Sequence, residues 1–218
     1  MMNNKKNMLQ AVGYSLVATL AVQLGSVIKT TYIVGSSIAF FSGVSVVAPL
    51  VGFFGGVVES FLVCLCRLAV HAACYGTVSF HYLAYCIPGL CAALYLASSH
   101  QLIRYWLPLA LMGLVVVHPV GGAAWLYSLY WLIPVALYLF KQDGIFAQAV
   151  GSTLIAHGVG SVIFLYSTFL PASVWIALIP VVFVERLSFA LGMVVVQKVY
   201  LLVPSVWKNV AEIKRACA

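Results

Sequence analysis

Residues 30–58 read TTYIVGSSIAFFSGVSVVAPLVGFFGGVV, a stretch of twenty-nine residues without Asp, Glu, Lys or Arg. A helix needs about 20 consecutive apolar residues to cross the hydrocarbon core of a bilayer. This stretch is therefore long enough to span a membrane. Further long apolar runs follow along the chain. Their repetition predicts a polytopic integral membrane protein with little mass outside the lipid bilayer.

The composition places the whole chain in the same class. It is 64% hydrophobic and only 7% charged, its mean hydropathy is +1.11, and a soluble domain carries roughly 25% charged residues. The apolar runs are continuous, whereas the strands of a membrane barrel alternate apolar and polar residues. We expect one all-α transmembrane domain over residues 1–218, a bundle of six to eight helices, some of them broken.

The charges and turn residues predict the topology. Basic residues lie near both ends, from Lys5 and Lys6 to Lys208 and Arg215, and Lys and Arg flank membrane spans on the cytoplasmic side. We therefore expect a multi-pass protein of the cell membrane with both termini cytoplasmic and an even number of spans. The predicted segments, of which the fifth is long enough for two spans, are Met8–Ile28, Tyr32–Val57, Ser60–Tyr75, Phe80–Ala97, Tyr105–Phe140, Ile145–Tyr166 and Ala172–Leu202.

Several function classes are disfavoured. The basic residues do not cluster as a nucleic-acid surface requires. The six cysteines include no CxxC pair, so we expect them to act as small apolar residues and expect no metal or cofactor. The HExxH, GxSxG and Walker A motifs are absent from the sequence, and four acidic residues leave little scope for paired-carboxylate chemistry. The chain is therefore not expected to be an enzyme.

Ionisable residues inside the apolar segments are the first candidates for a site, because charge within a bilayer is costly and usually faces a partner or a cavity. Glu59, Arg67 and His71 share one broad helical face. Arg67 either serves function or extends toward an interface. Glu185 and Arg186 lie deep in the last segment, point about 100° apart, and are each expected to find a partner on another helix.

A break in the fifth segment is the second candidate. His118 and Pro119 precede a Gly-Gly pair, and broken backbone at membrane depth is tolerated only beside protein or water. The aromatic residues that follow form either an interfacial belt or a wall that stacks on a planar ligand. Because helical spacing puts Tyr127 and Trp131 on one face and Trp125 on another, we expect the first two to contact the ligand.

His157 completes the predicted binding site. It lies in the middle of the segment Ile145–Tyr166, among Thr and Ser residues on one helix face. Such a face suits either hydrogen bonds between helices or the lining of a cavity. We expect a ligand cavity between this face and the break at His118, with Glu59 or Glu185 supplying charge.

The stretch Phe41–Glu59, FSGVSVVAPLVGFFGGVVE, resembles the early part of the S components of energy-coupling-factor vitamin transporters. In that family a Pro-containing segment leads into a Gly-rich helix that often carries a Glu. The resemblance implies six helices, a vitamin bound from the outer side, and docking on a transmembrane coupling subunit with two ATPases. The small residues Ala11, Ser15 and Thr19 are a loose analogue of the docking motif in the family's first helix.

These observations favour a small-solute membrane transporter, or the substrate-binding subunit of one, for uptake of a vitamin-like or other aromatic solute. The first alternative is a structural or assembly protein of a membrane complex, whose polar residues only join helices. The second is an intramembrane lipid-modifying enzyme that uses His118, His157 or Glu185. A polar-lined cavity open to one side distinguishes a transporter from the structural alternative.

Overall fold

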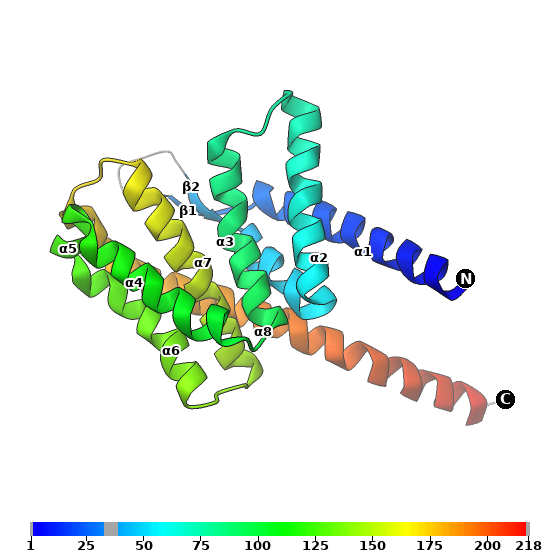
Figure 1. The fold of residues 1–218 in the computed structure, drawn as a ribbon. Coiled ribbons are helices and arrows are strands. Elements are labelled where there is room, and N and C mark those ends of the chain that lie inside the picture. Colours follow the sequence, from blue (N-terminus) through cyan, green and yellow to red (C-terminus); the bar gives the residue numbers. More distant parts are fainter. Residues whose placement is uncertain (1, 33–38, 217–218) are drawn as a thin grey trace.

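The fold is a bundle of helices with one short hairpin of strands near its N-terminal end (Figure 1). The computed structural model describes the backbone of residues 2–32 and 39–216, and the side chains of residues 12–28 and 43–202. The elements in chain order are α1 (Met2–Val27), β1 (Lys29–Tyr32), β2 (Ala39–Ser42), α2 (Val44–Tyr75), α3 (Phe80–Ala97), η1 (Leu102–Trp106), α4 (Leu107–Val117), α5 (Pro119–Ala123), η2 (Trp125–Trp131), α6 (Leu132–Leu139), α7 (Ile145–Ser167) and α8 (Ala172–Ala216).

Four helices are long and apolar enough to cross a membrane, among the residues that the structure describes. They are Val44–Tyr75, Phe80–Ala97, Ile145–Ser167 and Ala172–Leu202. Shorter apolar helices cover Val12–Val27, Leu102–Val117 and Trp125–Leu139. The helical membrane class is thus supported, while the count of six to eight spans stays a prediction.

One boundary prediction was wrong. The segment Tyr32–Val57 was expected to be one span, but residues 29–42 include the antiparallel strands β1 and β2, and the helix begins only at Val44. The next segment, Ser60–Tyr75, was expected to be a separate span, and α2 joins it to the preceding stretch across a kink. A break inside α2 occurs at Gly56, whose φ of 81° and ψ of −165° are not helical. Glycine tolerates this conformation because it has no Cβ, so two helical stretches meet there at a kink, close to the predicted boundary between Val57 and Ser60.

The predicted break at His118 is confirmed. α4 ends at Val117, and His118 is extended, with φ −75° and ψ 133°. Its ring Nδ1 accepts a hydrogen bond from the Gly121 amide at 3.4 Å and so caps α5. A 3₁₀ helix, η2, then carries the aromatic residues of this region into α6.

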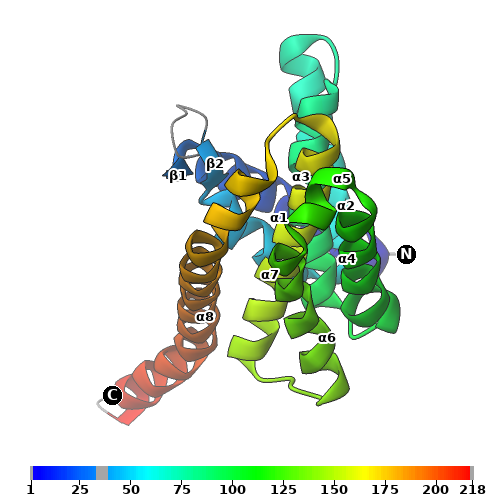
Figure 2. The same cartoon turned by 90° about the vertical axis from the view of Figure 1, so that its left-hand side faces the viewer.

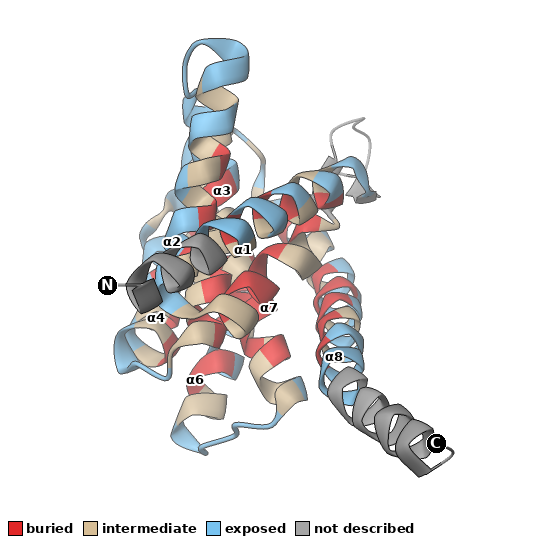
Figure 3. Ribbon diagram, turned by 90° about the vertical axis from the view of Figure 1, so that its right-hand side faces the viewer, coloured by how far each residue is buried: buried red, intermediate tan, exposed pale blue. Residues whose placement is uncertain are grey.

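α7 lies at the centre of the bundle and is buried along most of its length (Figure 3). It contacts α3 and α8, and also α4, α6 and η2, and it lies between α3 and α4 in Figure 1; Figure 2 shows the same bundle from the side. Its small residues permit close approach on several sides: a Cβ on Gly158, for example, would come within 2.7 Å of Nε1 of Trp131. The turn between α2 and α3, by contrast, is exposed.

Candidate functional site

A cavity of about 280 Å³ opens among the ends of α2, α3 and α7 and the middle of α8. Its lining combines small residues and prolines, which leave space between the helices, with aromatic and polar side chains. α2 contributes Val44, Ser45 and Pro49; α3 contributes Phe80, His81, Ala84, Tyr85, Pro88 and Gly89; α7 contributes Ala156, His157, Gly160, Ser161, Ile163, Phe164 and Ser167; Thr168 and Arg186 complete it.

A three-membered hydrogen-bond network lies at the inner end of this cavity. The Tyr127 hydroxyl is 2.6 Å from Nε2 of His157 and 2.9 Å from Oγ of Ser161, and Ser161 Oγ is 3.4 Å from the same His157 nitrogen. His157 and Ser161 line the cavity, one helical turn apart on α7, whereas Tyr127 reaches them from η2. The network fixes these rings and hydroxyls in place, because each polar group is buried and held by a neighbour.

Arg186 brings a buried charge to the cavity wall. Its Nη2 donates to Oε2 of Glu185 at 2.8 Å, and its guanidinium carbon lies 4.7 Å from the centre of the Phe189 ring. The direct pairing of these two neighbours was not expected, because partners were predicted on other helices. Their Cα–Cβ directions diverge on the helix, but both side chains are long enough to bend together. A buried ion pair needs a carboxylate and a guanidinium in contact, and adjacent positions can provide this.

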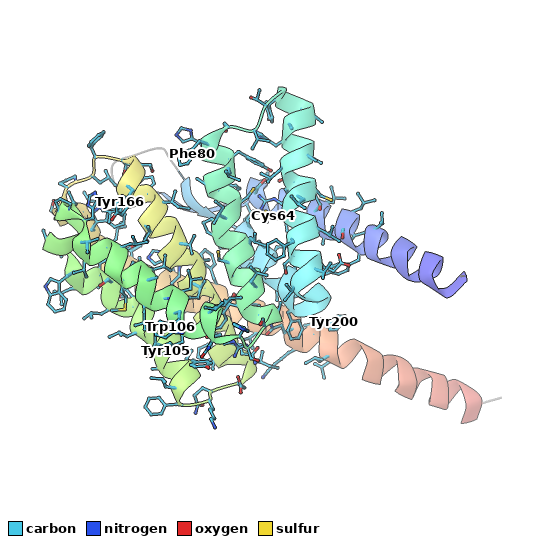
Figure 4. The ribbon with its side chains drawn as sticks, viewed as in Figure 1. Cys64, Phe80, Tyr105, Trp106, Tyr166 and Tyr200 are labelled. Carbon is cyan, nitrogen blue, oxygen red and sulfur yellow. The ribbon has the colours of Figure 1, made fainter. Side chains whose placement is uncertain are left out.

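Aromatic rings surround the outer part of the cavity. Phe80, His81 and Tyr85 come from the first turns of α3, and Phe164 comes from α7. Figure 4 shows Phe80 at the end of α3 that lies near the exposed α2–α3 turn. Rings of this kind give large apolar contact areas. With His157, Ser161 and Arg186 at the inner end, the cavity suits a solute that has an apolar planar body and a polar or anionic group.

Tyr127 and Trp131 lie behind α7 rather than in the cavity lining. Both are essentially fully buried, at 1% and 0% exposure, whereas Trp125 is 51% exposed. The rings of Tyr127 and Trp131 meet edge to face with centroids 6.0 Å apart, and Tyr127 meets Trp175 in the same way at 5.3 Å. Tyr127 and Trp131 therefore face the interior of the bundle and Trp125 faces outward, as the helical spacing predicts. The two buried rings pack against other aromatic rings.

Two further predicted residues lie away from the cavity. His118 caps α5 and stacks edge to face on Tyr166, with ring centroids 4.8 Å apart. The carboxylate of Glu59 accepts a hydrogen bond of 2.5 Å from the Ser15 hydroxyl, between α2 and α1. Of the predicted ligand contacts, the structure thus brings His157 to the cavity wall, with Tyr127 bonded to it, and places Glu185 next to the lining residue Arg186.

Several lining residues could not be singled out in the sequence. Ser45, Phe80, Tyr85 and Pro88 lie in apolar segments of ordinary membrane composition, and only the pairing of α3 with α2 and α7 brings them together. A cluster of three or more His, Cys, Asp or Glu side chains that could hold a metal ion is absent from the described part of the chain.

Comparison of this chain with protein families, with curated proteins and with solved structures found no match.

Proposed function

We propose that this protein is a small-solute membrane transporter, or the substrate-binding subunit of one, for a vitamin-like or other aromatic solute. The observation that carries the proposal is the cavity of about 280 Å³, which has aromatic rings at its outer part and His157, Ser161 and Arg186 at its inner end. Ligand pockets are typically concave, mostly apolar and equipped with a few fixed polar groups. Polar residues that only join helices would not need such a space.

The proposal includes a topology of six to eight spans with both ends in the cytoplasm. Four long apolar helices and three shorter ones supply the candidate segments. The basic residues near both ends, from Lys5 and Lys6 to Lys208 and Arg215, support cytoplasmic termini and so an even number of spans. Labelling of Cys217 with a membrane-impermeant thiol reagent tests the orientation: labelling in intact cells would contradict it.

The proposal also concerns partner subunits. Its sequence contains no Walker A motif, so any coupling to ATP would require a transmembrane partner subunit with ATPases, as in the vitamin transporters that residues 41–59 resemble. Co-purification in mild detergent followed by native mass spectrometry tests this part of the proposal. Recovery of ATPase subunits supports it, and a chain that transports solute alone in liposomes contradicts it.

One observation favours an enzyme as the second candidate. Ser161 Oγ lies 3.4 Å from Nε2 of His157 at a cavity wall, and a serine beside a histidine can act as a nucleophile with its base. Ser161→Ala separates the two functions. An enzyme would lose turnover by several orders of magnitude, whereas a binding protein would keep most of its affinity.

A binding screen tests the leading proposal. The purified protein in lipid nanodiscs is scanned for thermal stabilisation by a panel of water-soluble vitamins and aromatic carboxylates. Phe80→Ala should weaken binding of an active compound, because Phe80 lines the cavity. Phe169→Ala is the matched control, since Phe169 is exposed and does not line it. Equal binding by the two variants would place the ligand elsewhere.

A further inference from the structure

Among the described side chains, three arginines are buried within the apolar bundle, and they differ in their partners. Arg104 donates from Nη1 to Asp143 at 3.1 Å and from Nε and Nη2 to backbone carbonyls. Arg186 is paired with Glu185. Arg67 is just as buried, at 3% exposure, yet its Nε and Nη2 have no hydrogen-bond partner among the described residues.

The two atoms without partners form one edge of the guanidinium group. Nε–H and Nη2–H point in parallel, which is the two-donor fork with which arginine grips anions. A small cavity of about 20 Å³ adjoins Arg67 between α1, α2 and α3, with Ser60, Cys64 and Cys86 in its lining. Figure 4 shows Cys64 on α2, in the region where that helix lies beside α3. The cavity is distinct from the aromatic one, although Gly89 borders both.

Aromatic rings flank the guanidinium but do not neutralise it. Its central carbon lies 6.0 Å from the centre of the Tyr82 ring and 5.6 Å from that of Tyr85. The Tyr82 hydroxyl donates to the Arg67 carbonyl at 3.4 Å, and the Ser60 hydroxyl donates to the Gly56 carbonyl at 2.7 Å. Cation–π contacts at such distances are weak compared with an ion pair.

None of the acidic side chains that the structure describes provides a counter-charge for Arg67. The chain has four Asp and Glu residues. Asp143 and Glu185 are paired with the other two buried arginines, and Glu59 is bonded to Ser15; Glu212 lies outside the described side chains. A buried charge without a counter-charge is strongly unfavourable, so an external anion would resolve the imbalance at Arg67.

We propose that the cavity beside Arg67 is a binding site for a halide ion of chloride size. The space accommodates about one water-sized particle, which favours a monatomic anion over a carboxylate or phosphate group. A halide would accept both N–H groups of the fork, with the thiols of Cys64 and Cys86 as weak additional donors. A water molecule would fit as well, but it would leave the charge of Arg67 without compensation. This site is independent of the proposed transport function.

Bromide locates such a site directly. Crystals of the full chain grown in bromide are measured at the bromine absorption edge. The expected result is an anomalous peak within about 3.5 Å of Nε and Nη2 of Arg67, a distance typical of a hydrogen-bond acceptor larger than oxygen. A peak for water at that position without anomalous signal would overturn the proposal, and this measurement needs no variant that must fold.

Stability in solution provides the second measurement. Replacing gluconate by chloride at constant ionic strength should raise the unfolding midpoint of the wild type by roughly 2–5 °C, because a ligand of the folded state stabilises it. Arg67→Met should abolish this difference. Lys198→Met, which removes an exposed cation of the same charge, should retain it. An equal midpoint in both salts for the wild type would contradict halide binding.

Discussion

α7 separates two regions that contain the same kinds of residue and differ in packing. On the side of η2, Tyr127, Trp131 and Trp175 form an aromatic cluster without exposed rings. On the side of α2 and α3, the rings of Phe80, Tyr85 and Phe164 border a cavity. At the first region Gly158 brings α7 so close to Trp131 that a Cβ would come within 2.7 Å of its Nε1, whereas a Cβ on Gly160 at the cavity would lie 3.7 Å from Pro88. A group of aromatic residues alone does not therefore indicate a ligand site.

The largest expected effect is on the aromatic cluster. Trp131→Ala should lower the free energy of unfolding by about 3–5 kcal/mol, because it leaves a large cavity in a fully packed region. Unfolding by denaturant in mixed micelles measures it. Trp106→Ala is the control, since Trp106 is 53% exposed and should change stability little. If both variants unfold alike, the region beside η2 is not tightly packed.

The second largest effect is expected at the ion pair between Glu185 and Arg186. Glu185→Gln should cost about 2–3 kcal/mol of stability, since it leaves the buried Arg186 without its carboxylate. Asp143→Asn is the matched change, because Asp143 also pairs with a buried arginine but its side chain is 70% exposed, and its effect should stay below about 1 kcal/mol. Equal losses would show that burial of the pair does not set its strength.

The link between the two regions should show a smaller effect. Tyr127→Phe removes the hydroxyl that forms hydrogen bonds with His157 and Ser161. It should destabilise the protein by about 1–2 kcal/mol, because these two buried side chains each lose a hydrogen-bond partner. It should also weaken ligand binding, since His157 loses its fixed orientation. Tyr105→Phe provides the control, because no hydrogen bond of the Tyr105 hydroxyl is found in the described structure. Unchanged stability and binding in Tyr127→Phe would contradict the linkage.

Much of the fold follows from hydrophobic runs and breaks. The runs at 80–97, 145–166 and 172–202 coincide with helices, and the break at His118 follows from its Pro-Gly-Gly context. The kink at Gly56 lies next to the predicted boundary between Val57 and Ser60. Local rules did not reveal the strands β1 and β2 within the apolar run before Val44, because the pairing of two strands depends on contacts between separate segments.

Less of the candidate site than of the fold could be predicted from the sequence. His157 could be recognised because a histidine in the middle of a membrane segment needs a polar neighbour, and the structure provides Tyr127 and Ser161. The opposite wall of the cavity comes from α2 and α3. Its residues carry no chemical signal of their own, and which helices pack together is a long-range property that a run of apolar residues does not encode.

Filling the cavity tests the central claim most directly. Gly160 lines it, and a Cβ there would have ordinary contact, 3.7 Å from Cγ of Pro88, so Gly160→Leu should fold while its side chain occupies the ligand space. Gly113→Leu is the control, because nothing lies within 4 Å of a Cβ at that position. In a thermal-shift screen of water-soluble vitamins and aromatic carboxylates, at least one compound should stabilise the wild type and Gly113→Leu but not Gly160→Leu. Equal stabilisation of all three proteins, or none by any compound, would contradict a solute site in this cavity.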